Sequence, residues 1–370
     1  MYLNSSKILL IITLLVVLVL DISTAFVPMA SATSIPFTTA SSNNIMTNIR
    51  EKNKKKIYPN LSINIRGGGS SETKIHSASS LVEFHNGPFW QSTLIFTAAN
   101  ALGWVISLLT GSHVHLDLIG TGAFAVAGLP SLVGVNSVSD VMSSRIPLSG
   151  AMMTLWGTKL AGFLFFRALK TGHDVRLDDV LSTFSGTTSF WIVSLLWGLL
   201  CSLPHTLGTT SSLSFGITAD TPITTKLGIV LYAVGIAFET LADLQKWNFK
   251  QSNPKGFCNV GVWSLSQHPN WFGNLLLWSG IFMINAPVLV KTLPLSSSFL
   301  QRIWGSKRLL LALLSPLFLW TLFSGQANGS ITPALELANK KYGNDPKYQQ
   351  YISEVPLIFP NPLKWFDSKS

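Results

Sequence analysis

Four ionisable side chains at helical spacing are the residues of this chain best suited to chemistry. Glu239, Asp243, Lys246 and Lys250 follow one another at intervals of four, three and four residues. In a helix these intervals place all four on one face, as a stripe from two carboxylates to two ammonium groups. The basic end would suit a phosphate-bearing ligand. A helix end that leaves a bilayer would carry the same stripe, because carboxylates and lysines pair and snorkel there without any ligand.

A second polar group lies downstream, just before an apolar run. His268, Pro269 and Asn270 bring an imidazole and an amide, which donate and accept hydrogen bonds, around a proline that fixes the turn. Trp263 and Trp271 flank this group and could stack on cofactor rings. Structural alternatives exist for both features, because a histidine can cap a helix and tryptophans are common at membrane interfaces.

The elements that must position these residues are membrane helices. Charged residues make up only 11% of the 370 residues, the mean hydropathy is +0.39, and apolar runs recur near the roughly 20 residues that a span needs. No alternating barrel pattern occurs, so the runs must satisfy their backbone groups as helices. The sequence predicts an all-α, polytopic transmembrane bundle of six or seven spans, near residues 93–110, 116–135, 147–168, 189–207, 226–242, 273–290 and 309–324.

The charge and cysteine patterns narrow the class of partner. The net charge is +10, but the basic residues are spread over loops and ends, so we exclude nucleic acid. The expected partners are the bilayer and a lipid-like small molecule, while the oligomeric state stays open. The distribution of lysine and arginine places the Asp243 stripe and the C-terminal residues in one compartment. Cys201 and Cys258 have neither metal-site nor disulfide spacing, so no metal is expected.

The N-terminal region is typical of a targeting sequence. Residues 1–25 predict a signal peptide, because Lys7 precedes an apolar run at residues 8–20 that is too short for a span. Residues 26–80 predict a disordered, transit-like segment, in which Glu51 is the only acidic residue as far as Ser71. The junction at Ala25 and Phe26 resembles plastid-targeting presequences of algae with complex plastids. We therefore expect a plastid membrane, with the endoplasmic reticulum as the alternative, and a membrane domain at residues 90–365.

Four blocks of the chain resemble one protein family. They read L-W-G-T-K-L-A-G-F-L at residues 155–164, A-D-L-Q-K-W at 242–247, H-P-N-W-F-G at 268–273 and K-Y-G-N-D-P at 341–346. Together they are similar to the membrane family related to the C-terminal domain of steroid 5-alpha-reductases. The resemblance implies a helical membrane domain that holds NADPH in its C-terminal half.

The activity that the resemblance implies is NADPH-dependent reduction of a carbon–carbon double bond in a steroid, prenyl or fatty lipid. The catalytic residue stays unknown. Asp117 and Glu239 are the expected substrate residues, because an acidic side chain at a span boundary could polarise a substrate, although Asp117 could equally sit among the lipid headgroups. The implied cofactor-binding residues are Asp243, Lys246, Lys250, Trp263, His268, Asn270, Trp271, Lys341 and Tyr342.

Three positions depart from the family pattern and keep two other functions open. Gln267, Trp271 and Asn274 stand where the family usually has arginine, tyrosine and glutamate. Gln267 lacks the charge and forked donation of arginine, and Trp271 has no phenolic proton. One alternative is a membrane S-adenosylmethionine-dependent methyltransferase of the isoprenylcysteine carboxyl methyltransferase type, although that motif carries the missing tyrosine and glutamate. The other is a non-catalytic membrane protein.

The targeting interpretation predicts the destination of residues 1–80 on their own. A fluorescent protein fused behind residues 1–80 should enter the plastid or its surrounding membranes in an alga with a complex plastid, because both signals lie in this segment. Microscopy beside plastid autofluorescence measures this. A cytosolic signal, or steady residence in the secretory pathway, would contradict the prediction.

Overall fold

A computed structural model describes residues 88–112, 114–171, 181–211, 216–218, 220–290, 296, 298–329 and 334–360. Two of the expected segments, the signal peptide at 1–25 and the transit-like segment at 26–80, lie outside these residues. The described part of the chain contains helices and no strand, so the prediction of an all-α bundle is confirmed. The elements are α4 (Pro88–Thr110), α5 (Leu116–Gly128), η1 (Leu129–Leu132), α6 (Val138–Ser143), α7 (Arg145–Thr171), α9 (Phe184–Thr209), α10 (Ile223–Ser252), η2 (Gly261–Ser264), α11 (Pro269–Leu289), α12 (Phe299–Gly305), α13 (Lys307–Ala327), α14 (Ala334–Tyr342) and α15 (Pro346–Glu354).

Five of these helices have the length and apolar composition of a membrane span, as an integral membrane protein requires. They are α4, α9, α10, α11 and α13. The expected run at 116–135 is broken, because a short 3-10 helix that begins at Leu129 follows α5. Together the two pieces cover only Leu116–Leu132. The expected run at 147–168 belongs to α7, which is 27 residues long but carries Lys159 near its middle.

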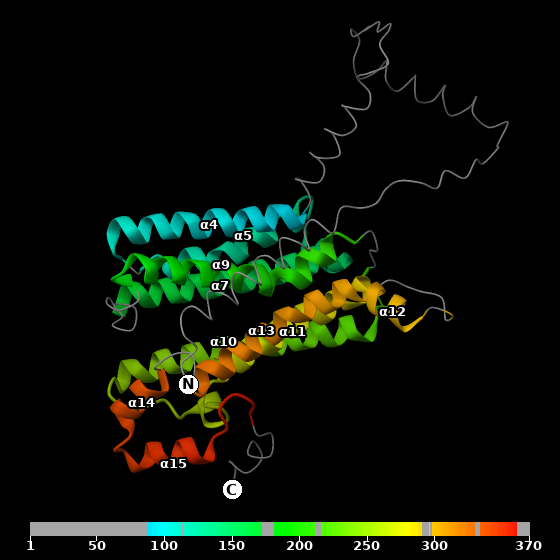
Figure 1. The fold of residues 1–370 in the computed structure, drawn as a ribbon. Helices are drawn as coiled ribbons and strands as arrows, with labels where there is room; N and C mark the ends of the chain where they lie inside the picture. The colour runs from blue at the N-terminus through cyan, green and yellow to red at the C-terminus, as the bar shows by residue number, and fades with distance from the viewer. Residues whose placement is uncertain are drawn as a thin grey trace, which may run out of the picture. The chain divides into compact units, whose positions relative to one another are not determined.

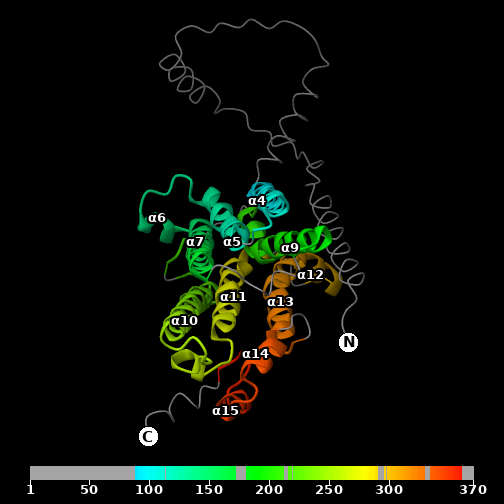
Figure 2. The same cartoon turned by 90° about the vertical axis from the view of Figure 1, so that its left-hand side faces the viewer.

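The central helix of the bundle is α11. It packs against α7, α9, α10 and α13. Figure 2 shows α11 between α10 and α13, with α7 and α9 above it. Helices α4, α5, α7 and α9 lie side by side on one flank (Figure 1). The sequence favours a helix start at Pro269, because proline in the first helical turn lacks an N–H that would have no helical hydrogen-bond partner there.

An aromatic core fills the space between α11 and the α4–α9 flank. The Trp156 ring of α7 lies edge-on to Phe124 and Trp278, with centroids 5.0 Å away in both cases. Phe96 of α4 meets Phe124 edge-to-face at 4.9 Å. All four side chains are fully buried, and edge-to-face geometry is the favoured arrangement for aromatic pairs.

Helices α10 and α11 make the most extensive contact in the described part of the chain, and glycines allow it. Gly228 faces Gly280, and Gly235 faces Gly273. A Cβ at Gly280 would lie 2.5 Å from the carbonyl oxygen of Gly228 and 2.7 Å from the nitrogen of Tyr232. Small residues at such crossings let two membrane helices approach backbone to backbone. The two glycine pairs therefore set the spacing between the helix that carries the ionisable stripe and the helix that begins at His268.

This close approach predicts that an added methyl group at Gly280 destabilises the bundle. Gly280→Ala should cost about 1–3 kcal/mol, because the clash is with backbone atoms that cannot rotate away. The matched control is Gly162→Ala in α7, where nothing lies within 4 Å of the added Cβ. Thermal unfolding in detergent should show a lower melting temperature for the first variant only. Equal melting temperatures for both variants would show that the α10–α11 contact is not constrained in this way.

Candidate functional site

A pocket opens where α10 ends, α11 begins and α13 ends. Its volume is about 190 Å³, and helices α14 and α15 lie at the same end of the bundle (Figure 1). We call it the Lys246 pocket. Its lining residues are Lys246, Lys250, Phe257, Cys258, Trp263, Gln267, His268, Gln326, Ala327, Leu335, Ala338, Tyr342, Tyr348 and Tyr351. Among these described lining residues, two are lysines and none carries a carboxylate.

Lys246 lies over the ring of Trp263, which a hydrogen bond holds against α10. Its Nζ lies 4.2 Å from the ring centroid of Trp263, which is a cation–π distance. The Trp263 indole donates to the carbonyl oxygen of Ala242 at 2.9 Å, and the backbone N–H of Val262 donates to Gln245 Oε1 at 2.9 Å. These bonds hold η2 against the last turns of α10, so the tryptophan and the lysine share one wall of the pocket.

Lys250 ties the end of α10 to the loop that follows and to α14. Its Nζ donates to the carbonyl oxygen of Gly256 at 2.6 Å, to Tyr342 Oη at 2.8 Å and to the carbonyl oxygen of Pro254 at 3.4 Å. An ammonium group has three N–H donors, so these three acceptors use its full capacity. Lys250 therefore holds α14 beside the pocket through its hydrogen bond to Tyr342.

The phenol of Tyr342 is more acidic than an ordinary tyrosine. Burial by itself would raise its pKa, but the hydrogen bond and charge of Lys250, with Lys341, outweigh burial and lower it. Two neighbouring phenols differ in this respect, because burial raises the pKa of Tyr348 and of Tyr351. Among the three tyrosines of the pocket, Tyr342 is thus the one whose anion the surroundings favour.

Gln267 and its neighbours hold residues 334–360, here called the tail, against the start of α11 through hydrogen bonds. Gln267 Nε2 donates to the carbonyl oxygens of Val355 at 2.6 Å and Ile352 at 3.1 Å. The Ser266 hydroxyl donates to the carbonyl oxygen of Ile358 at 2.8 Å, and Tyr351 Oη donates to that of Trp263 at 2.7 Å. Gln267 therefore has structural partners in the tail, which the sequence did not reveal.

His268 is the N-cap residue of α11 and presents a neutral imidazole to the pocket. Its ring stacks on Trp271 with centroids 4.0 Å apart and an interplanar angle of 7°, and Trp271 in turn stacks on Phe323 of α13. Burial, with a smaller contribution from the Lys246 charge, lowers the pKa of His268 to about 3. Trp271 holds the histidine ring from behind and does not itself line the pocket.

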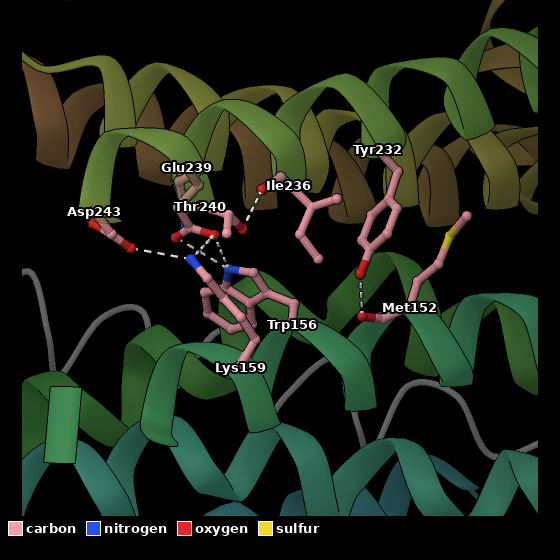
Figure 3. Close-up of polar contacts among 9 residues, drawn as sticks. Met152, Trp156, Lys159, Tyr232, Ile236, Glu239, Thr240 and Asp243 are labelled. Atoms are coloured by element: carbon pink, nitrogen blue, oxygen red, sulfur yellow. Dashed lines mark hydrogen bonds and ion pairs between the residues drawn. The ribbon is translucent and has the colours of Figure 1, made fainter. Parts of the chain in front are cut away.

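The acidic end of the stripe faces α7 instead of the pocket, as Figure 3 shows. Lys159 Nζ lies 3.0 Å from Asp243 Oδ2 and 3.6 Å from Glu239 Oε2. The indole of Trp156 donates to Glu239 Oε2 at 3.0 Å, and Asn274 Nδ2 donates to Glu239 Oε1 at 3.1 Å. We call these five residues the Glu239 cluster. It joins α7, α10 and α11 around a carboxylate that is only 3% exposed.

The structure brings together about half of the predicted site residues. Lys246, Lys250, Trp263, His268 and Tyr342 line one pocket, whereas Asp243 and Glu239 belong to the Glu239 cluster. Asn270, in the first turn of α11, and Lys341, next to Tyr342 in the chain, are not part of the lining, and Asp117 lies in the first turn of α5.

Sequence reasoning missed Trp156 and Lys159 as partners of the stripe. Their three-residue spacing places both on one face of α7, and this spacing was the feature of the sequence that could have identified them. In the described part of the chain, no group of three His, Cys, Asp or Glu side chains could hold a metal ion.

Comparison with known families finds a match that covers most of the helical domain. Residues 103–355 match the family described as "Protein of unknown function (DUF1295)". Neither the comparison with curated proteins nor that with solved structures finds a match. The matched residues include all of the Glu239 cluster and every lining residue of the Lys246 pocket.

The lowered pKa of His268 predicts how stability depends on pH. Because the pKa of an unfolded histidine is about 6.5 and that of the folded residue is about 3, the unfolded chain binds a proton that the folded chain does not. Stability should fall as the pH drops from about 6.5 towards 3, and the loss attributable to His268 by pH 5 is about 2 kcal/mol. Melting temperatures of the parent protein and His268→Gln, taken in detergent from pH 7.5 to 5, measure the difference. Parallel pH profiles for the two proteins would contradict a buried, neutral His268.

Proposed function

The chain belongs to the family described as "Protein of unknown function (DUF1295)", and from this premise we propose that it is an integral membrane NADPH-dependent reductase of a carbon–carbon double bond in a lipid-like substrate. The observation that carries the proposal is the Lys246 pocket. It combines two lysines with five aromatic side chains, has no acidic residue in its lining, and lies at one end of an apolar helical bundle. Phosphates and planar rings are the ligand groups that such a lining favours.

The resemblance of the sequence blocks to the C-terminal domain of steroid 5-alpha-reductases supports the same activity. The chemistry that NADPH supplies when bound is a hydride for one carbon of the double bond. Lys246 would bind a phosphate oxygen, Trp263 would flank a ring, and His268, neutral at physiological pH, would donate or accept one hydrogen bond. Five apolar helices give a lipid-like substrate a route from the bilayer, while a charged cofactor reaches the pocket from the aqueous side.

The charge of the pocket favours NADPH over S-adenosylmethionine. The sulfonium of S-adenosylmethionine is a cation, and the two lysines of the pocket would repel it, with no lining carboxylate to compensate. Asn274, which replaces the glutamate of the methyltransferase motif, is bound to Glu239 in the bundle interior. The non-catalytic alternative rests on one observation, the saturation of Lys250 by three protein acceptors.

This proposal predicts that NADPH raises the apparent melting temperature of the detergent-purified protein, because a ligand that binds only the folded state stabilises it. S-adenosylmethionine at the same concentration should give no shift. Lys246→Ala should weaken NADPH binding roughly ten- to hundred-fold, which corresponds to a lost charge-assisted hydrogen bond of about 1.5–3 kcal/mol. Lys250→Ala should also weaken it, through release of α14.

Lys255→Ala is the matched control, because Lys255 follows the end of α10, is exposed and does not line the pocket. It should bind NADPH as the parent protein does. If Lys246→Ala and Lys250→Ala both retain parental affinity, the basic end of the stripe is only a helix end. A shift produced by S-adenosylmethionine and not by NADPH would favour the methyltransferase instead.

A further inference from the structure

We propose that the end of the bundle where α13 begins binds an anionic phospholipid of the membrane. The headgroup phosphate lies on Arg308, with Arg302 and Lys307 beside it, and an acyl chain follows the exposed apolar side of α13. This end of the bundle, which includes α12, lies opposite α14 and the Lys246 pocket (Figure 1). The inference does not depend on the proposed function.

The guanidinium group of Arg308 has a donor nitrogen that the fold does not use. Its Nη2 donates to the carbonyl oxygen of Leu207 and to the hydroxyl of Thr210, both at the end of α9. A guanidinium group carries five N–H donors, so Nη1 remains for a phosphate oxygen, while Nε is enclosed without a hydrogen-bond partner. Within the described part of the chain, no carboxylate pairs with Arg308. A phosphate is the kind of acceptor that such a group binds most strongly.

A second guanidinium group lies at the same end of α9. Arg145 Nη2 donates to the carbonyl oxygen of Gly208 at 3.1 Å, the residue that follows the Leu207 to which Arg308 donates. The two arginines thus bind consecutive carbonyl oxygens, although they come from α7 and α13. Basic groups gathered between membrane helices at a membrane surface are typical of sites for anionic headgroups.

The start of α13 adds to this positive charge. Lys307 and Arg308 are its first two residues, its first turn holds no acidic residue, and its N-cap residue forms no side-chain cap. Arg302 lies in the last turn of α12, shortly before. Basic side chains at a helix N-terminus repel the positive end of the helix dipole, and an anion offsets that repulsion. The sequence itself has no acidic residue between Asp243 and Glu336.

The apolar surface beside these charges fits the acyl chain of a lipid. Phe299 of α12 is 76% exposed, and Leu310 and Leu317 of α13 are about half exposed. Leu310 follows Lys307 by three residues and Leu317 follows Leu310 by seven, so all three lie on one side of α13. A lipid chain along this side places its headgroup at the level of Lys307, over the bundle end where Arg308 reaches α9. Helix α4 also exposes apolar side chains but contains no charged residue, so it offers no headgroup site.

Lipid-dependent stabilisation of the full chain in a non-ionic detergent tests this site. Phosphatidylglycerol should raise the melting temperature, because a ligand of the folded state stabilises it, and phosphatidylcholine at the same concentration should raise it much less. Native mass spectrometry should show phosphatidylglycerol retained on the protein and give its affinity. Arg308→Gln should weaken that affinity roughly ten-fold, through the lost charge-assisted hydrogen bond, and Lys307→Gln roughly five-fold.

Lys226→Gln is the matched control, because Lys226 is an exposed basic residue near the start of another span, α10. It should leave the affinity for phosphatidylglycerol unchanged. Lys307→Gln keeps the contacts of Arg308 with α9, so it tests the site even where Arg308→Gln lowers the melting temperature without lipid.

Four results would overturn the inference. Equal shifts with the two lipids would show that the headgroup charge is not recognised. An equal loss of affinity in Lys226→Gln and Lys307→Gln would show a diffuse surface charge, and parental affinity in both Arg308→Gln and Lys307→Gln would place the lipid elsewhere. A shift of the same size with inorganic phosphate would show a site for a free anion.

Discussion

The backbone contact between α10 and α11 is the constraint on which the rest of the molecule depends. Two pairs of facing glycines bring the helices so close that a single added Cβ would meet backbone atoms. Membrane helices gain little from burying apolar surface against one another, because lipid is equally apolar, so close packing has to supply the association. This contact places the stripe of α10 beside the His268 end of α11, and both the pocket and the Glu239 cluster follow from it.

The Glu239 cluster links this helix pair to α7 and explains why the stripe divides in two. Lys159 of α7 forms ion pairs with both carboxylates, so the acidic half of the stripe is paired inside the bundle. The basic half lies farther along α10 and reaches the pocket. A buried carboxylate needs an opposite charge and hydrogen-bond donors, and Lys159, Trp156 and Asn274 together provide them. The same sequence stripe thus serves an interhelical contact at one end and a ligand-sized pocket at the other.

Residues that depart from the family pattern are accommodated by specific contacts in this structure. Gln267 donates to two carbonyl oxygens of the tail, Asn274 donates to Glu239, and Trp271 supports the imidazole of His268 by stacking. All three side chains are thus integrated into the fold through contacts with the tail, with α10 and with the start of α11.

The sequence by itself determined the helical class, the approximate positions of the membrane runs and the one-faced placement of Glu239, Asp243, Lys246 and Lys250, because hydropathy and helical period are local properties. It also singled out Trp263, His268 and Tyr342, which the structure places in the lining of one pocket. Only the tertiary structure decided that Lys159 divides the stripe, that Lys250 fastens Tyr342 and that Gln267 holds the tail. Those contacts join residues about 80 to 90 positions apart, and their geometry depends on how closely the glycines let α10 and α11 pack, which no local pattern encodes.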